Sequence, residues 1–117
     1  MSKLDKLFKL PKVVAIFVPS TTDVVADGAD KQKEWADKIG AQFSEWFGGV
    51  TTYDAMGGWM SDDHGLVQEG IKIVESRATA EALAKYTDDV VTLAEQLKAD
   101  MSQEAVTLLH EGDMYLV

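Results

Sequence analysis

Two short segments of the sequence place a histidine beside carboxylates. The first is Ser61-Asp62-Asp63-His64-Gly65, and the second is His110-Glu111-Gly112-Asp113. An imidazole with neighbouring carboxylates can bind a divalent metal, or it can act as a general base that an acid orients. Adjacent residues in a turn rarely all face one ion, and Asp, Ser and Gly are common turn formers. We therefore expect the first segment to be a solvated turn. The second segment is a weaker candidate for a metal or catalytic site than the first. The sequence thus predicts no metal site, no cofactor and no catalytic residue.

The aromatic residues near the first segment suggest recognition instead. Trp59 and Met60 precede this turn, and Tyr53 lies six residues before Trp59. If the arm that carries Trp59 projects beyond the helices, Trp59 and Met60 form an exposed anchor pair of the kind that dominates protein interfaces. If it does not, both side chains fold down onto the core or onto a dimer sheet. The sequence leaves these alternatives open.

The sequence contains none of the common nucleotide or nucleophile motifs. Walker loops, dinucleotide-type GxGxxG motifs and nucleophile patterns are not present, and Gly48-Gly49 follows an expected helix, whereas phosphate cradles precede one. The chain has no cysteine, which excludes disulfides, thiolate zinc sites and cysteine nucleophiles. Arg77 is the only arginine, so an arginine clamp for phosphates is not available.

The charge of the chain is unevenly distributed. In residues 1–12 four lysines stand against one aspartate, a net charge of +3, and because the whole chain carries −9, residues 13–117 carry −12. An acidic body repels phosphate backbones, which argues against direct nucleic-acid binding and favours a protein partner with a basic surface. The lysines alternate with Leu4, Leu7 and Phe8, so we expect residues 1–12 to be a basic N-terminal arm, either for docking or as a terminal turn.

The same composition bears on location. No apolar run approaches the roughly 18 residues that a membrane span needs. No long apolar region follows the N-terminal lysines, so we do not expect a secretory signal. A cytoplasmic protein without a membrane span is the default expectation.

Hydrophobic periodicity defines the first half of the domain. Val13–Val18 is an apolar, β-branched run typical of a central strand, and residues 19–30 are rich in turn formers and read as a loop. From Asp30 the apolar residues Trp35, Ile39, Phe43 and Trp46 recur at helical spacing. We expect Asp27 or Asp30 to cap this helix and Gly48-Gly49 to end it.

The second half begins with a predicted hairpin of residues 50–56 and 70–76, with a bulge or close backbone approach at Gly57-Gly58. Thr79 is placed to cap a second long helix. The apolar face of that helix is Leu83, Tyr86, Val90, Ala94, Leu97 and Met101, and its acidic face is Glu81, Asp88, Asp89 and Glu95. A short hairpin of residues 105–109 and 114–117 should end the chain.

This order of elements predicts one α+β domain over residues 13–117 after the arm of residues 1–12. A single hairpin between two strand–helix units is the ferredoxin-like β-α-β-β-α-β plan, a two-layer sandwich, here with a short extra C-terminal strand. In that plan the first and third strands are central, and residues 13–18 and 70–76 are the two strands richest in aliphatic side chains.

Thirteen residues form a pattern that resembles a group of small uncharacterised prokaryotic α+β proteins. The pattern is Phe-Gly-Gly-x-Thr, then Gly-x-Trp, then Val-Glu-Ser, then Gln-Glu-Ala-Val, and the match spans about residues 13–117. The resemblance implies a fold and no assigned reaction. The residues that fill the pattern are Phe47, Gly48, Gly49, Thr51, Gly58, Trp59, Val74, Glu75, Ser76, Gln103, Glu104, Ala105 and Val106.

Together these features favour a non-enzymatic, acidic interaction module, expected to be a homodimer, that regulates or inhibits a larger partner. A sharper version is a mobile-element inhibitor of a nucleic-acid-handling protein. The residues expected to bind the partner are Trp59, Met60, Tyr53, Asp62, Asp63, Asp88, Asp89 and Glu95. The alternative is a small enzyme or ligand-binding domain with a pocket around the central hairpin, for which the candidate polar groups are Tyr53, Asp54, His64 and Glu75.

Overall fold

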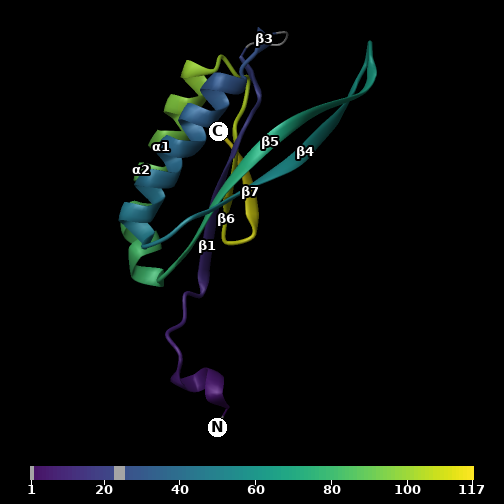
Figure 1. Ribbon diagram of the computed structural model, residues 1–117. Helices are drawn as coiled ribbons and strands as arrows, with labels where there is room; N and C mark the ends of the chain where they lie inside the picture. Colours follow the sequence, from purple (N-terminus) through teal and green to yellow (C-terminus); the bar gives the residue numbers. More distant parts are fainter. Residues whose placement is uncertain (1, 23–25) are drawn as a thin grey trace.

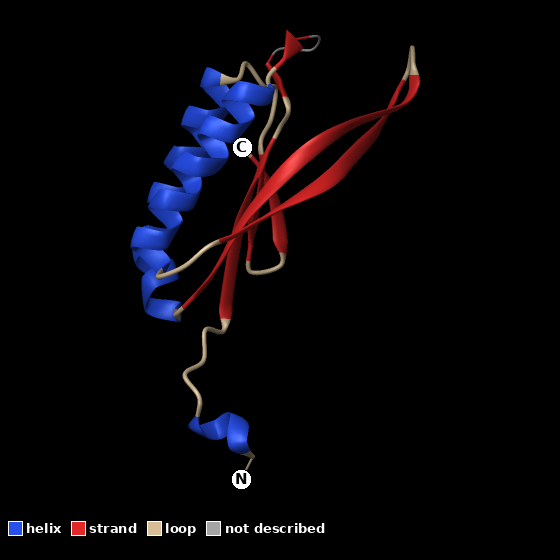
Figure 2. Cartoon of the chain, viewed as in Figure 1, coloured by secondary structure: helices blue, strands red, loops and turns tan. Residues whose placement is uncertain are grey.

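The computed structural model describes residues 2–22 and 26–117. Within these residues two long helices cover one face of a five-stranded antiparallel sheet, which confirms the α+β class (Figures 1 and 2). The strand order is β4-β5-β1-β6-β7. The elements are η1 (Lys3–Lys6), β1 (Lys12–Val18), β2 (Thr21–Thr22), β3 (Ala26–Asp27), α1 (Ala29–Phe47), β4 (Thr51–Ser61), β5 (Gly65–Ala78), α2 (Ala80–Asp100), β6 (Thr107–His110) and β7 (Asp113–Leu116).

The two strands expected to be central are central. β1 pairs with β5 on one side and with β6 on the other, while β5 also pairs with β4. Side chains alternate between the faces of a strand, so Val14, Ile16 and Val18 point toward the helices and are fully buried. Val13, Ala15 and Phe17 lie on the opposite face of the sheet.

Helix α1 buries the predicted stripe, with Trp35, Ile39 and Phe43 in the core. Its end is also as predicted, because Gly48 adopts a φ of 95° and its N–H donates to the carbonyl of Ser44. A residue with a Cβ atom rarely adopts that left-handed backbone conformation. Its start is not as predicted, because the N-cap position is occupied by Gly28 and not by either aspartate.

Helix α2 begins where expected, with the Thr79 hydroxyl accepting a 3.1 Å hydrogen bond from the Ala82 N–H. Five of its six predicted apolar residues are buried in the core. The sixth, Tyr86, is half-buried and stacks on Trp46 of α1, with ring centroids 5.4 Å apart and planes 13° from parallel. The two helices are therefore joined by ring stacking at this end.

At the other end of the helix pair, a carboxylate joins the two helices. Asp100 accepts hydrogen bonds from the Trp35 indole N–H at 2.7 Å and from the Lys31 ammonium at 3.0 Å. These two donors, the indole first, hold the pKa of Asp100 below its ordinary value of 3.8. The charged carboxylate is therefore the form that the fold favours.

The central hairpin is longer than predicted. Its strands extend over residues 51–61 and 65–78, and their pairing is continuous from Thr51–Glu75 to Ser61–Gly65. The predicted bulge at Gly57-Gly58 is therefore wrong. The outer part of the hairpin projects beyond the helices (Figure 1), and most residues from Gly58 to Leu66 are exposed. No alternation of apolar and polar residues is therefore imposed there for sequence analysis to detect.

Two shorter hairpins complete the fold. Part of the predicted loop of residues 19–30 forms a small sheet of β2 and β3, and residues 23–25 lie outside the described residues. At the C-terminus Glu111 and Gly112 both have positive φ values, of 56° and 87°. This is the combination that a tight two-residue turn between antiparallel strands requires, and it confirms the predicted C-terminal hairpin.

The N-terminal arm extends away from the rest of the molecule (Figure 1). With the arm included, the molecule measures 57 × 25 × 21 Å along its principal axes. Its residues from Ser2 to Pro11 are all exposed, including Leu4, Leu7 and Phe8. Among the described residues, neither α1 nor α2 is long and apolar enough to span a membrane.

Replacing Asp100 with asparagine should lower the melting temperature by a few degrees at neutral pH, because Lys31 loses its anionic partner. The pKa of Asp100 is depressed in the folded state, so its stabilisation is present above the ordinary value of 3.8 and is lost as the pH falls through the folded-state pKa. The melting curves of wild type and Asp100→Asn should therefore converge below that value. Asp89→Asn, at an exposed site on α2, is the control, and a difference independent of pH would contradict this account.

Candidate functional site

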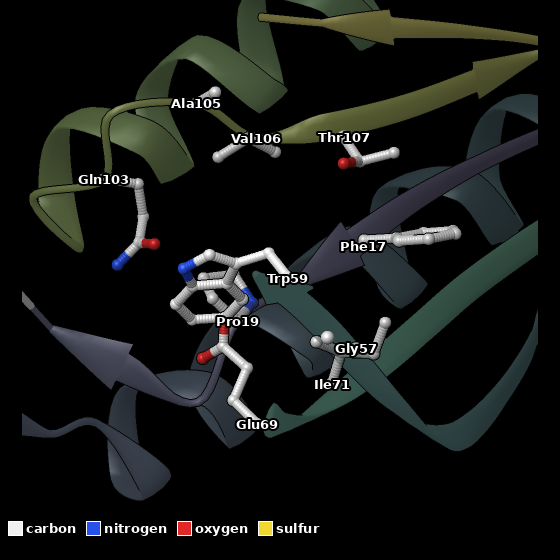
Figure 3. Close-up of a pocket in the computed structure, with 11 residues that line it drawn as sticks. Phe17, Pro19, Gly57, Trp59, Glu69, Ile71, Gln103, Ala105, Val106 and Thr107 are labelled. Carbon is white, nitrogen blue, oxygen red and sulfur yellow. The ribbon is translucent and has the colours of Figure 1, made fainter. Parts of the chain in front are cut away.

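A hollow of about 240 Å³ lies beside the central hairpin, on the face of the sheet away from the helices. Figure 3 shows the Trp59 indole in the middle of this hollow, with the side chains of Gln103 and Glu69 on either side of it. Three segments far apart in sequence meet here: the hairpin, the end of β1, and the connection from α2 to β6. The lining residues are Phe17, Pro19, Gly57, Gly58, Trp59, Glu69, Ile71, Gln103, Ala105, Val106 and Thr107.

The register of the sheet determines which side chains meet in the hollow. Phe17 of β1 lies opposite Ile73 of β5, and Ile71 and Glu69 follow at two-residue intervals on the same face. On β4, Gly57 lies opposite Glu69, and Trp59 is two residues further along. Gly57 has no side chain to fill the space between the carboxylate and the indole, so the hollow stays open.

The Glu69 carboxylate is held in place by neighbouring hydroxyls. Its Oε2 accepts hydrogen bonds from Ser20 Oγ at 3.4 Å and from Thr21 Oγ1 at 3.3 Å. The carbonyl of Thr21 accepts a 2.7 Å hydrogen bond from Gln103 Nε2, which also donates to the carbonyl of Met101 at 2.9 Å. Thr21 therefore connects the two polar side chains that face Trp59.

This combination of groups suits one kind of ligand. Aromatic and aliphatic walls favour a flat ring or alkyl groups, and an aromatic face next to a carboxylate favours a cation. The side-chain carbonyl oxygen of Gln103 can accept a hydrogen bond, because both N–H groups of its amide already donate to backbone carbonyls. The hollow therefore suits a cation with apolar substituents, or a molecule that joins such a cation to a heteroaromatic ring.

A second hollow, of about 410 Å³, lies where the base of the hairpin meets the N-terminal arm. The thirteen-residue pattern noted in the sequence divides between the two hollows. Gly58, Trp59, Gln103, Ala105 and Val106 line the first, and Phe47, Gly48, Gly49, Thr51, Glu75 and Ser76 line the second. Most residues of the pattern thus border surface hollows.

Of the residues expected to bind a partner, Trp59 alone lines the first hollow, with its side chain 50% exposed. Met60, the other half of the expected anchor pair, is 75% exposed on the opposite face of the hairpin and does not accompany it. Tyr53 lies on the same face as Trp59 but nearer the base of the hairpin. Asp88, Asp89 and Glu95 are exposed on α2, in the other layer.

Asp62, Asp63 and His64 form the exposed turn at the tip of the hairpin. The backbone N–H groups of Asp63 and His64 both donate to Ser61 Oγ at 3.3 Å, as expected of a turn. In residues 2–22 and 26–117, no group of three or more histidine, aspartate or glutamate side chains could hold a metal ion.

The polar groups of the alternative pocket do not converge. Asp54 forms a 2.7 Å ion pair with Lys72 on the helix-facing side of the hairpin, Glu75 lines the second hollow, and His64 is at the tip. The hollow beside the hairpin is instead formed with Glu69, Gln103 and Phe17, which sequence analysis did not select as a site. Gln103 belonged to the pattern, but no sequence signal marked Glu69 or Phe17.

No family model matches the chain, and no curated protein matches it. Two solved structures resemble it over almost their whole length. The first is described as a phage SAM lyase in complex with S-methyl-5′-thioadenosine, with a TM-score of 0.62 and 19% identity over 99% of this chain and 95% of that one. The second is a phage SAM lyase in the apo state, with a TM-score of 0.64 and 18% identity over 95% and 94%.

This likeness contradicts the functional prediction drawn from the sequence. That prediction was a non-enzymatic, protein-binding inhibitor, and it judged an enzyme the less favoured reading. Both structures with this fold are described as a phage SAM lyase, which is an enzyme. The prediction was wrong because it relied on the lack of catalytic motifs and on net charge, and neither reports the enzymatic activity that this fold carries in the phage structures.

Thr21→Val should loosen the site by removing the hydroxyl that holds Glu69. We expect the free energy of unfolding, measured by urea denaturation, to fall by about 1 kcal/mol, the usual value of one such hydrogen bond. Thr52→Val is the matched control, because Thr52 is exposed on β4 and the hydroxyl has no hydrogen bond to the described residues. An equal loss in both variants would show that the Thr21 hydroxyl does not support the site.

Proposed function

We propose that this protein is an enzyme that binds S-adenosylmethionine in the hollow beside the central hairpin and cleaves it to S-methyl-5′-thioadenosine. The observation that carries the proposal is the likeness of the fold, over 99% of the chain, to a phage SAM lyase with that thioether bound. The chemistry of the hollow supports it independently, because S-adenosylmethionine joins a sulfonium cation with alkyl substituents to an adenine ring.

Two groups of the hollow match the sulfonium end. The Trp59 face can contact the cation or stack on the adenine ring. The Glu69 carboxylate, already oriented by Ser20 and Thr21, supplies the opposite charge. The hollow, at about 240 Å³, is smaller than the roughly 300–1,000 Å³ typical of small-molecule sites, so it accommodates one end of the substrate.

The reaction makes few demands on acid–base groups. When the bond between sulfur and the aminobutyryl γ carbon breaks, its electron pair goes to sulfur, which leaves as a neutral thioether. As this bond breaks, the substrate's own carboxylate attacks the γ carbon and closes a lactone ring, so no proton is transferred and no protein nucleophile is required. Ring closure joins opposite charges, which the apolar walls formed by Phe17, Ile71 and Val106 favour.

Because the positive charge on sulfur disappears in the transition state, Glu69 stabilises the bound substrate more than the transition state. Its contribution is therefore to binding. The apolar walls and Trp59 orient the substrate and exclude water from it.

We also propose that the sheet follows the ferredoxin-like plan. The order β4-β5-β1-β6, with α1 and α2 on one face, supports this assignment. β7 is then an addition next to β6. On this plan the hollow lies on the uncovered face of the sheet.

The Glu69→Gln substitution removes the negative charge of the side chain and keeps its size and shape, so it tests the contribution of the charge. The variant should bind S-adenosylmethionine about tenfold more weakly, which corresponds to about 1.4 kcal/mol, and should bind the neutral product S-methyl-5′-thioadenosine nearly as well as wild type. Calorimetric titration measures both affinities, and chromatography of the products measures turnover, in which KM should rise while kcat stays the same or increases. The matched control is Glu45→Gln, an exposed glutamate on α1. An equal loss of affinity for both ligands would show that Glu69 does not interact with the sulfonium group.

Trp59→Ala tests the location of the site. Loss of a stacked ring should lower the affinity for both S-adenosylmethionine and S-methyl-5′-thioadenosine by about tenfold or more. Circular dichroism should show that the fold of the variant is intact. Met60→Ala, one residue away on the other face of the hairpin, should leave both affinities unchanged. A wild-type protein that neither binds nor consumes S-adenosylmethionine would overturn the proposed function itself.

A further inference from the structure

A groove between α2 and the C-terminal hairpin is separate from both hollows already described. Its volume is about 400 Å³. The lining is almost entirely apolar, with two polar side chains, Thr87 and His110, at one end. The apolar lining residues are Val91, Leu108, Tyr115, Leu116 and Val117.

The two polar side chains of the groove bond to each other. The Thr87 hydroxyl donates its hydrogen to the carbonyl of Leu83 at 2.6 Å, so its oxygen must accept the 3.1 Å hydrogen bond from His110 Nε2. His110 therefore carries a hydrogen on Nε2, and its ring packs edge-on against Tyr115. With these groups paired, the rest of the groove is an apolar surface open to solvent.

The rim of the groove is acidic. Asp88 lies three residues before Val91 and Glu95 four residues after it, so all three share one face of α2. Asp113 begins β7, opposite His110. Lys85 and Lys98 lie about one turn beyond the rim at either end, and the carboxylates outnumber them.

The N-terminal arm has the complementary character. Leu4, Leu7 and Phe8 have exposed fractions of 74%, 65% and 83%, and residues 1–12 carry a net charge of +3. Leu4 and Leu7, three residues apart across a 3₁₀ turn, lie on one side of the arm. The arm thus presents apolar side chains between lysines, and the groove presents an apolar surface between carboxylates.

The arm leaves the start of β1 in a direction that leads away from the α2–β7 groove of the same copy of the protein. Lys12 forms a 2.8 Å ion pair with Glu111, and the Val13 N–H donates to the same carboxylate at 3.1 Å. This anchors the start of β1 to the turn of the C-terminal hairpin. Pro11 restricts Leu10 to an extended conformation. Phe8 and Leu10 border the second hollow, and the residues before them extend away from the sheet and the helices (Figure 1).

We propose that the arm of one copy of this protein binds in the α2–β7 groove of a second copy. Leu4, Leu7 and Phe8 cover the apolar surface, and the lysines of the arm face Asp88 and Glu95. The occupant is thus a segment of the same chain, and the contact links copies by exchange of their arms. The arrangement is independent of ligand binding at the hairpin.

The absence of cysteine from the sequence permits a clean cross-linking test in the full-length protein. Phe8→Cys in one sample is mixed with Leu116→Cys in a second sample that carries a size tag, and disulfides form in air. We expect a mixed disulfide between the two variants. The control replaces Leu116→Cys with Met56→Cys, a residue of similar exposure on the central hairpin, and should give a yield about tenfold lower, because docking raises the local thiol concentration.

The charge of the rim is tested with matched variants. Asp88→Lys with Glu95→Lys should reduce the mixed disulfide about tenfold, because the arm and the rim then repel each other. Asp62→Lys with Asp63→Lys makes the same change in charge at the hairpin tip and should leave the yield unaltered. Equal effects of the two pairs would overturn the assignment of the rim.

Three outcomes would overturn the proposal. Equal yields for the Leu116→Cys and Met56→Cys mixtures would show that the groove is not occupied by the arm. A disulfide within one chain of the Phe8→Cys/Leu116→Cys double variant, without mixed product, would show that the arm folds back on its own copy. Binding of the wild-type protein to phosphatidylserine vesicles, lost in Phe8→Ser, without a mixed disulfide, would assign the arm to an anionic lipid surface.

Discussion

The antiparallel pairing of β1 with β5 is the constraint on which the rest of the structure depends. One end of β5 is held in the core, where Val74 lies opposite Ile16 beneath the helices, and both side chains are fully buried. The other end leaves the core and forms one arm of the projecting hairpin. Because the side chains of a strand alternate strictly, a shift of one residue in the core would turn Glu69 away from the hollow. Burial at one end of a strand thus determines the chemistry at the other.

The hollow in turn depends on a small number of polar contacts between loops. Thr21, Glu69 and Gln103 come from three separate segments, and hydrogen bonds join them in sequence from carboxylate to hydroxyl and from carbonyl to amide. Each group is partly exposed, so each bond contributes modestly to stability. The main effect of these bonds is on geometry, because together they hold the side chains of Glu69 and Gln103 beside the indole of Trp59.

The elements of the fold were largely predictable, and the hollow was not. The helices follow from apolar residues such as Ile39 and Leu97 at helical spacing, and the central strands from their aliphatic content, because both signals arise from burial. The outer half of the hairpin was missed because Gly58 and most residues from there to Leu66 are exposed, so burial imposes no apolar pattern on strands that pair through their backbones. Glu69 was missed because the residues that orient its carboxylate in the hollow lie 48 or more positions away in the sequence.

The long outer strand has a consequence for how the protein behaves in solution. β4 is an edge strand of eleven residues, and the outward backbone groups of an edge strand can pair with another chain. What opposes such pairing is mutual repulsion, since the protein carries a net charge of −9 at neutral pH. Near its isoelectric point of about 4.5 that repulsion vanishes. Colloidal stability should therefore be lowest in mildly acidic buffers, where repulsion no longer prevents the backbone edge of β4 from pairing with another chain.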